Sequence, residues 1–238
     1  MLKAVIKSVV RRFGYDIVRY TEKRKRPINV LDLVVRDKLT HDQRFFFVQI
    51  GANDGIQSDP LHHLIMEYHL EGLLVEPLPD FFERLRQNYV SEPQLSFENC
   101  AIATSDGERI MYCISPNVCV PEKVHRQATF YKHKILRVAK DIGLGKEYVE
   151  EIKVPTLTLR TLFRKHSIQK VSLLQIDTEG YDYEILKMAF ATHVYPEIIN
   201  FEYIQLSWED RLKSREMLIE EGYRFMNIGR DTLAVREV

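Results

Sequence analysis

Acidic side chains follow directly after two apolar runs in the second half of the chain. Asp177 and Glu179 come after the run 171–176, and Glu202 stands near the end of the run 196–203. Carboxylates at one site serve as a general base, as ligands of a divalent cation or as partners of a ligand's amine. The alternative for Asp177 and Glu179 is capping of the helix that follows them. We predict that Asp177, Glu179 and Glu202 are catalytic. Asp177 acts either directly as the base or through a divalent metal ion that it shares with Glu202.

A glycine-rich turn earlier in the chain has the composition of a ligand-binding loop. The apolar run 45–50 leads into Gly51, Asn53 and Gly55, and the two glycines can take positive φ and let a ligand approach the backbone. Glu76 ends the next apolar run, about 20 residues further on, where a carboxylate can bind both ribose hydroxyls of an adenosine. The phosphate-binding pattern G-x-G-x-x-G is missing. This favours S-adenosylmethionine, an adenosine ligand without phosphates, over a nicotinamide dinucleotide.

The expected cofactor site also includes residues after a third strand, which we predict over 95–103. Small and apolar side chains there suit a flat adenine, although plain strand core is an equal alternative for Cys100. Asp59 would also lie close to a ligand over the glycine turn. The predicted cofactor-binding residues are Gly51, Ala52, Asn53, Asp54, Gly55, Glu76, Pro77, Cys100, Ala101, Ile102 and Asp177.

A parallel sheet is needed to bring these residues together. Short apolar runs alternate with helix-like stretches, which indicates an α/β domain. The runs lie at 45–50, 72–75, 171–176 and 196–203. Open α/β sheets bind ligands at the carboxyl ends of their strands, so the glycine turn, Glu76 and the later carboxylates should share one rim. An antiparallel hairpin, 223–228 and 232–235, closes the domain.

Two regions differ from this pattern. Residues 1–40 form a basic amphipathic helix and a lead-in to the domain at 41–238. The apolar residues of 1–20 share one helical stripe, which can make peripheral contact with an anionic membrane, bind a partner or dock on its own domain. The second region is an irregular insertion at about 109–152, typical of a substrate lid or recognition segment.

Composition limits the class of protein. The chain has 238 residues, of which 45% are hydrophobic, and its net charge at pH 7 is zero, so no overall field attracts nucleic acid. Residues 1–26 nevertheless carry nine basic residues against two acidic ones. Three cysteines without metal-type spacing favour a reducing compartment. No apolar run approaches the roughly 18 residues of a membrane span, so we expect a cytoplasmic protein.

Several motifs, taken in order, resemble one enzyme family. They are VQIGANDG, LLVEP, CAIATSDG, VPTLTLRTLF and LLQIDTEGYDYEIL, followed by NFEY. Over roughly residues 45–235 the chain is similar to the FkbM family of S-adenosylmethionine-dependent methyltransferases. The resemblance implies a Rossmann-like class I methyltransferase fold: a seven-stranded, mostly parallel sheet with a reversed last strand and helices on both faces. It also implies O-methylation of a hydroxyl on a sugar, glycan or natural product, with Asp177 and Glu179 at the reaction centre.

Two other classes of protein stay open. A non-catalytic scaffold or sensor with the same fold would bind the cofactor and use the basic N-terminal segment to dock on a partner or membrane. A nicotinamide dehydrogenase is weakened by the missing phosphate fingerprint. We expect S-adenosylmethionine as cofactor, with Mg²⁺ or another divalent cation as a second option. The expected partner is a hydroxylated small molecule or glycan and not a nucleic acid, and a homo-oligomer is left open.

Overall fold

The computed structural model describes residues 29–41 and 44–237. The chain divides into two compact units, Met1–Val30 and Leu31–Val238. The predicted amphipathic helix in 1–20 lies outside the described residues. The second unit contains both sheets and every residue of the predicted site.

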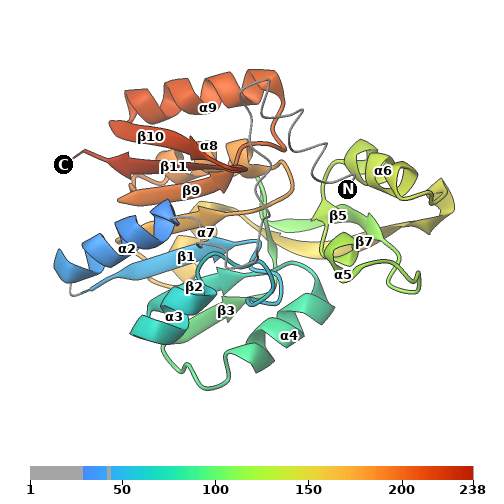
Figure 1. The fold of residues 1–238 in the computed structure, drawn as a ribbon, viewed down its shortest axis with the longest axis horizontal. Helices are drawn as coiled ribbons and strands as arrows, with labels where there is room; N and C mark the ends of the chain where they lie inside the picture. Colours follow the sequence, from blue (N-terminus) through green and yellow to red (C-terminus); the bar gives the residue numbers. More distant parts are fainter. Residues whose placement is uncertain (1–28, 42–43, 238) are drawn as a thin grey trace, which may run out of the picture. The chain divides into compact units, whose positions relative to one another are not determined.

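Seven strands form the main sheet, in the order β10-β11-β9-β8-β1-β2-β3 (Figure 1). They are β1 (Phe46–Ile50), β2 (Glu71–Val75), β3 (Leu95–Glu98), β8 (Leu173–Ile176), β9 (Ile198–Glu202), β10 (Tyr223–Ile228) and β11 (Asp231–Arg236). The first five pair in parallel, whereas β11 runs antiparallel to both of its neighbours, β9 and β10. The predicted mostly parallel sheet with a reversed last strand is therefore confirmed.

The central strands are recognisable in the sequence because both of their faces are buried. All four residues of β8 and all five of β9 are buried, and such strands appear as continuous apolar runs. Besides Glu202 at the end of β9, the polar exceptions are Gln49, Gln175 and Asn200, which are register partners on three adjacent strands. The Asn200 side-chain amide donates to Gln175 Oε1 at 2.9 Å, so burial of these two amides is partly offset by a hydrogen bond.

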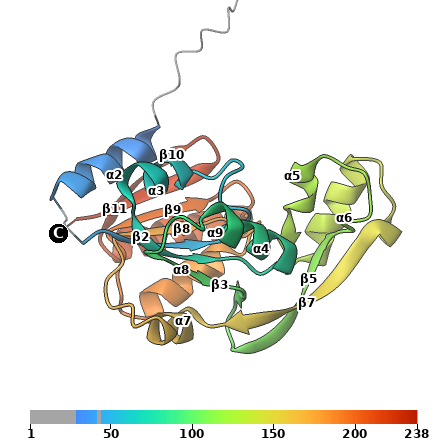
Figure 2. The ribbon, with the colours of Figure 1, turned by 90° about the horizontal axis from the view of Figure 1, so that it is seen from below.

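Helices cover both faces of this sheet (Figure 2). They are α2 (Val30–His41), α3 (His62–Tyr68), α4 (Pro79–Asn88), α7 (Leu159–Lys165), α8 (Asp182–Ala191) and α9 (Trp208–Glu220). Apolar residues of α7, α8 and α9 pack against β1, β2, β8 and β9 in the largest hydrophobic cluster, while α2 and α3 lie on the opposite face. In the part of the chain that is described, no helix has both the length and the apolar composition that crossing a bilayer requires.

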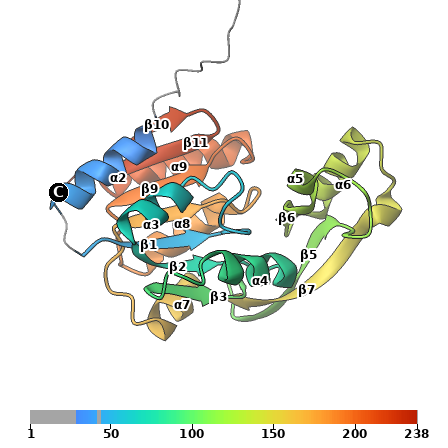
Figure 3. The ribbon, with the colours of Figure 1, turned by 60° about the horizontal axis from the view of Figure 1, so that its bottom comes forward.

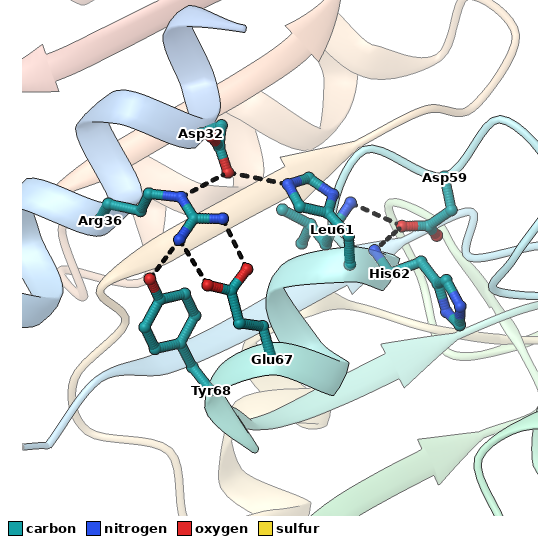
Figure 4. A network of polar contacts seen from close by, with 8 residues as sticks. Asp32, Arg36, Asp59, Leu61, His62, Glu67 and Tyr68 are labelled. Carbon is teal, nitrogen blue, oxygen red and sulfur yellow. Dashed lines mark hydrogen bonds and ion pairs between the residues drawn. The ribbon is translucent and has the colours of Figure 1, made fainter.

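A network of charged side chains joins α2 to α3 (Figure 4). Arg36 contacts Glu67 of α3 at 2.6 Å and Asp32 of its own helix at 3.0 Å. The same Asp32 carboxylate accepts from His63 at 2.8 Å. Exposed ion pairs contribute little to stability, so burial of apolar residues such as Val35 supplies more of the attachment of α2.

Four further strands form a second sheet in the order β4-β7-β5-β6. They are β4 (Ala101–Ile102), β5 (Gly107–Ile114), β6 (Ala128–Thr129) and β7 (Val149–Leu157), accompanied by α5 (Glu122–His125), α6 (Lys132–Asp141) and the 3₁₀ turn η1 (Lys146–Tyr148). The region expected as an irregular insertion at about 109–152 thus contains regular structure. Figure 3 shows α5, α6 and this sheet beyond the carboxyl ends of β1 and β2.

The third strand predicted over 95–103 is present as β3, but it ends at Glu98. The chain leaves the main sheet after β3, and β4 belongs to the second sheet, where it pairs with β7. Asn99 explains the break, because its side-chain amide donates to the backbone oxygens of Glu76 at 2.8 Å and Pro77 at 3.2 Å. These hydrogen bonds hold the chain against the end of β2 at the point where it turns away.

Candidate active site

A cavity of about 420 Å³ lies at the carboxyl ends of β1, β2, β8 and β9. Its wall includes the glycine turn, the acid after β2, the residues around β4 and the acids after β8 and β9. The predicted site residues that line it are Gly51, Ala52, Asn53, Glu76, Pro77, Cys100, Ala101, Ile102, Asp177, Glu179 and Glu202. The sheet therefore brings together most of the residues that the sequence predicted to meet at one rim.

Asp54 and Gly55 are not in the cavity wall, because their contacts are inside the turn. Asp54 Oδ1 accepts the N–H groups of Ile56 at 3.1 Å and Gln57 at 3.0 Å. Gly55 has φ of 73°, and a Cβ there would overlap the ring of Tyr89. Both residues thus fix the shape of the turn.

Gly51 connects the turn to the acidic loop after β8. Its φ is 81°, and a Cβ at this position would overlap the carbonyl oxygen of Asp177. The Gly51 N–H donates to Val75 O at 2.9 Å, and the Asp177 N–H donates to Ile50 O at 2.9 Å. Only a residue without a side chain lets the ends of β1 and β8 approach so closely.

Glu76 is a buried carboxylate in the cavity wall, with 4% of its surface exposed. It accepts the N–H of Asn53 at 2.9 Å on one oxygen and the N–H of Leu78 at 2.9 Å on the other. Burial raises the pKa of Glu76 to about 7, against the lowering effect of these two hydrogen bonds. The carboxylate therefore has a fixed orientation and titrates near neutral pH.

A second group of carboxylates surrounds the end of β8. The Asp177 side chain is open to the cavity, yet desolvation by the surrounding protein is the main cause that raises its pKa well above its usual value, and the charges of Glu179, Asp182 and Glu202 add to it. Burial likewise raises the pKa of Glu179 to about 7 and that of Asp182 to about 6. Glu179 and Asp182 therefore change protonation state near neutral pH, as general acids and bases often do.

Arg230 offsets part of this negative charge. Its guanidinium donates to Glu202 Oε1 through Nε at 2.9 Å and Nη2 at 2.6 Å. The other oxygen, Glu202 Oε2, is buried and has no hydrogen-bond partner among the described residues. One side of this carboxylate is thus neutralised, and the other faces the cavity wall without a donor.

Helix capping does not explain Asp177 or Glu179. The N-cap residue of α8 is Tyr181, and within the described residues it makes no side-chain capping hydrogen bond. Asp182 instead organises the loop, since its Oδ2 accepts from the Thr178 hydroxyl at 2.9 Å and the Gly180 N–H at 3.1 Å. The capping alternative was therefore wrong for both residues.

Residues of the second sheet and α6 reach this acidic loop. Lys134 of α6 donates to Gln205 O at 2.7 Å and Glu179 O at 3.3 Å. Glu179 has a positive φ of 52°, and a Cβ at Gly180 would overlap the Lys134 ammonium. Arg109 of β5 lies 4.0 Å from the ring centroid of Phe130, and its Nη1 donates to the hydroxyl of Tyr181 at 3.2 Å.

Other residues that line the cavity were not predicted from the sequence. Gln49 and Gln175 gave a signal, because each is a polar residue inside an apolar run that forms a buried strand. Arg126 and Phe130 gave none, since their position at the cavity depends on the packing of the second sheet. The missed lining residues are Gln49, Ile50, Gln57, Ser58, Pro60, Met111, Lys123, Arg126, Gln127, Ala128, Phe130, Gln175, Thr178, Tyr181 and Arg230.

Comparison with known proteins identifies the family. The model of the methyltransferase FkbM domain matches residues 49–225. Among curated proteins, none matches this sequence significantly. An FkbM methyltransferase from Methylobacillus flagellatus KT has a similar solved structure, with a TM-score of 0.50 and 12% identity over 81% of this chain and 43% of that one. The present chain thus spans less than half of that protein's length.

A putative caffeoyl-CoA O-methyltransferase from Staphylococcus aureus also has a similar structure, with a TM-score of 0.47 and 8% identity over 98% of this chain and 91% of that one. At such low identity these similarities concern the fold alone. The family match covers the glycine turn, Glu76 and the acidic loop after β8, and it agrees with the motifs read from the sequence. This chain belongs to the FkbM methyltransferase family.

Proposed function

We propose that this protein is an S-adenosylmethionine-dependent O-methyltransferase that acts on a hydroxyl of a sugar, glycan or natural-product acceptor. The observation that carries the proposal is the single cavity shared by the glycine turn, Glu76 and the carboxylates after β8 and β9. A methyltransferase for hydroxyl acceptors needs a nucleoside site and a base next to each other, and this cavity offers residues for both.

The polar groups of the cavity wall fit S-adenosylmethionine. Three buried acceptors, Gln49 Oε1, Asn53 Oδ1 and Glu202 Oε2, have no partner among the described residues. Buried acceptors of this kind are costly unless a ligand supplies donors, and the cofactor carries an ammonium and two ribose hydroxyls. When bound, it supplies a methyl group on a positively charged sulfur, which the nearby carboxylates favour.

For the cofactor we assign the turn from Gly51 to Asn53, the carboxylate of Glu76 with Pro77 beside it, and the apolar residues Cys100 to Ile102. Asp54 and Gly55 support this site by shaping the turn. Burial of Cys100, Ala101 and Ile102 gives the flat apolar wall that an adenine requires.

We assign Asp177 as the base, with Glu179 and Glu202 beside it. A hydroxyl attacks a methyl carbon only as its proton leaves, so a carboxylate within reach must accept that proton. A raised pKa makes a carboxylate a stronger base, and the environment of Asp177 raises its pKa by burial and by neighbouring negative charge. The new O–C bond forms as the C–S bond breaks, the proton passes to Asp177, and the products are the methyl ether and S-adenosylhomocysteine.

A divalent cation at Asp177 and Glu202 is the second way to activate the hydroxyl. In the residues that the structure describes, no three ligand-type side chains gather into a metal site. Mg²⁺ often uses only one or two carboxylates together with water and substrate, and Glu202 Oε2 is open for that role. Arg230 already balances the other oxygen of Glu202, so we favour the direct base. If a cation is required, removal of divalent ions with EDTA abolishes methyl transfer, and Mg²⁺ restores it.

The acceptor that we propose is a hydroxylated small molecule or glycan. The zero net charge of the chain argues against a nucleic-acid acceptor. A cytoplasmic location stays a prediction, and the oligomeric state is left open.

The test of the base is methyl transfer from radiolabelled S-adenosylmethionine to a panel of sugars, glycans and polyketides. We expect Asp177→Asn to lower turnover by about 10²–10⁴-fold, because the amide cannot accept the proton, while cofactor affinity changes little. Asp141→Asn, on the exposed end of α6, is the matched control and should retain full activity. Unchanged turnover in Asp177→Asn would refute the assignment of the base.

A further inference from the structure

Two basic side chains line one corner of a cavity that is otherwise acidic. Lys123 belongs to the short helix α5, and Arg126 follows it directly. The third basic residue in the described part of the wall is Arg230, which is ion-paired with Glu202. Lys123 makes no ion pair among the described residues, so its charge is not balanced within the cavity.

Arg126 is fixed in place at this corner. Its Nη1 donates to Gln57 O at 2.5 Å, and its own carbonyl accepts from the Asn53 side-chain amide at 3.3 Å. A guanidinium has five N–H donors, so most of those of Arg126 stay free for a ligand. The corner is therefore tied directly to the turn that we assign to the cofactor.

The nearest carboxylate does not neutralise the corner. Glu122 accepts from the Gln57 amide at 2.9 Å and forms an ion pair with Arg84. Glu122 is therefore already occupied by Arg84 and Gln57, so it does not balance the charges of both Lys123 and Arg126. The rest of the wall, including Glu76, Asp177 and Glu179, would repel an anion.

We propose that Lys123 and Arg126 form an anion-binding corner that holds a carboxylate or phosphate group of a bound ligand. This proposal depends on the proposed function only for the identity of the bound ligand. The anion has two sources, which share this chemistry: the carboxylate of the cofactor's amino-acid end, or an acidic group on the acceptor. An Arg and a Lys together suit either, since Arg offers a planar pair of donors and Lys a point charge.

The first arm of the test compares two nucleosides that differ in the anionic end. S-adenosylhomocysteine carries the amino-acid end, whereas 5′-methylthioadenosine lacks it. Calorimetry would measure both with the wild type, Lys123→Gln, Arg126→Gln and the double variant. Lys140→Gln, an exposed position of α6, is the charge-matched control. Lys123→Gln removes no internal hydrogen bond, so it keeps the test valid if Arg126→Gln disturbs the turn.

The second arm uses anions without a nucleoside. Inorganic phosphate, and D-glucuronate against D-glucose, would be titrated into the same variants and followed by NMR. In one supporting result, the variants lose about tenfold or more in affinity for S-adenosylhomocysteine, while their affinity for 5′-methylthioadenosine is unchanged. That result identifies the carboxylate of the cofactor as the anion that the corner binds. Unchanged nucleoside affinities, with glucuronate or phosphate binding lost, support an acidic acceptor.

Two results would overturn the proposal of an anion-binding corner. One is that the double variant behaves like Lys140→Gln in both arms. The other is that it loses both nucleosides equally, which would mean that the two residues only shape the cavity. If the wild type binds neither nucleoside, the proposed function is contradicted instead. The titrations with phosphate and glucuronate then still test whether the corner binds anions.

Discussion

Gly51 is the residue on which the approach of the two halves of the site depends most directly. Its positive φ and the nearby carbonyl of Asp177 leave no room for a side chain. Backbone in the left-handed region is itself unfavourable for other residues. A side chain at position 51 would therefore be unfavourable for two separate reasons: it would strain the backbone, and it would overlap with the acidic loop.

A comparison of Gly51→Ala with Gly222→Ala separates the effect of backbone strain from the effect of steric overlap. Gly222 has almost the same φ, 80°, but a Cβ there meets nothing within 4 Å. We expect Gly222→Ala to lower the free energy of unfolding by about 1 kcal/mol and Gly51→Ala by about 3 kcal/mol or more, with loss of cofactor binding. Urea unfolding measures both values. Equal destabilisation by the two substitutions would show that the close approach of Gly51 and Asp177 is unimportant.

Two carboxylates of the cavity wall make stability and binding depend on pH. Burial raises the pKa values of Glu76 and Glu179 to about 7, above those of unfolded chains, so the folded state binds the extra protons. Their contribution to stability is complete below the unfolded pKa near 4.5 and is lost as the pH rises through 7. A cationic ligand favours the ionised forms and therefore reverses part of this loss.

We predict that S-adenosylmethionine binds more tightly at pH 8 than at pH 6, by about tenfold for each group with a pKa near 7 that must ionise. The unliganded protein should lose stability over the same range. Calorimetric titrations at pH 6, 7 and 8 measure the first effect, and thermal unfolding the second. S-adenosylhomocysteine, without the sulfonium charge, should depend less on pH. Affinities that do not change with pH would contradict the role of these carboxylates.

At the scale of elements, the second sheet and α6 do more than extend the domain. Lys134 of α6 and Thr129 of β6 both donate to the carbonyl oxygen of Glu179, at 3.3 Å each. They hold a backbone segment with positive φ, and the Lys134 charge also lowers the pKa of Glu179. The position of the acidic loop is therefore coupled to the second sheet.

Lys134→Met tests this coupling. Loss of the ammonium removes hydrogen bonds to two backbone carbonyls and should raise the pKa of Glu179. We expect the pH midpoint for binding S-adenosylmethionine to move to higher pH, with weaker affinity at pH 7. Lys132→Met is the control, because Lys132 lies on the same helix but pairs with exposed Glu151. A midpoint that moves equally in both variants would exclude a specific role for Lys134.

The elements also show how far the sequence could predict this fold. The strands β1, β2, β8 and β9 were predictable because each is a continuous buried run with a polar residue or glycine at its carboxyl end. The break between β3 and β4 was not, because it depends on hydrogen bonds from Asn99 to a distant strand end. The same holds for Arg126, which lines the cavity, and for Lys134 and Arg109, which contact the acidic loop, because the packing of the second sheet positions all three.

At the scale of the whole molecule, the described chain consists of a parallel sheet that presents turns and acids at one rim, and a second sheet whose residues complete the cavity. Membership of the FkbM methyltransferase family agrees with this arrangement. In the proposed function, this cavity binds S-adenosylmethionine through Glu76 and the glycine turn.

Calorimetric titration of S-adenosylmethionine tests this claim most directly. We predict micromolar binding by the wild type, a loss of about tenfold or more in Glu76→Gln, and no binding of NAD. Glu92→Gln is the control, since Glu92 is also a buried carboxylate but does not line the cavity. Absence of binding to the wild type, or equal affinity of the wild type and Glu76→Gln, would contradict the account.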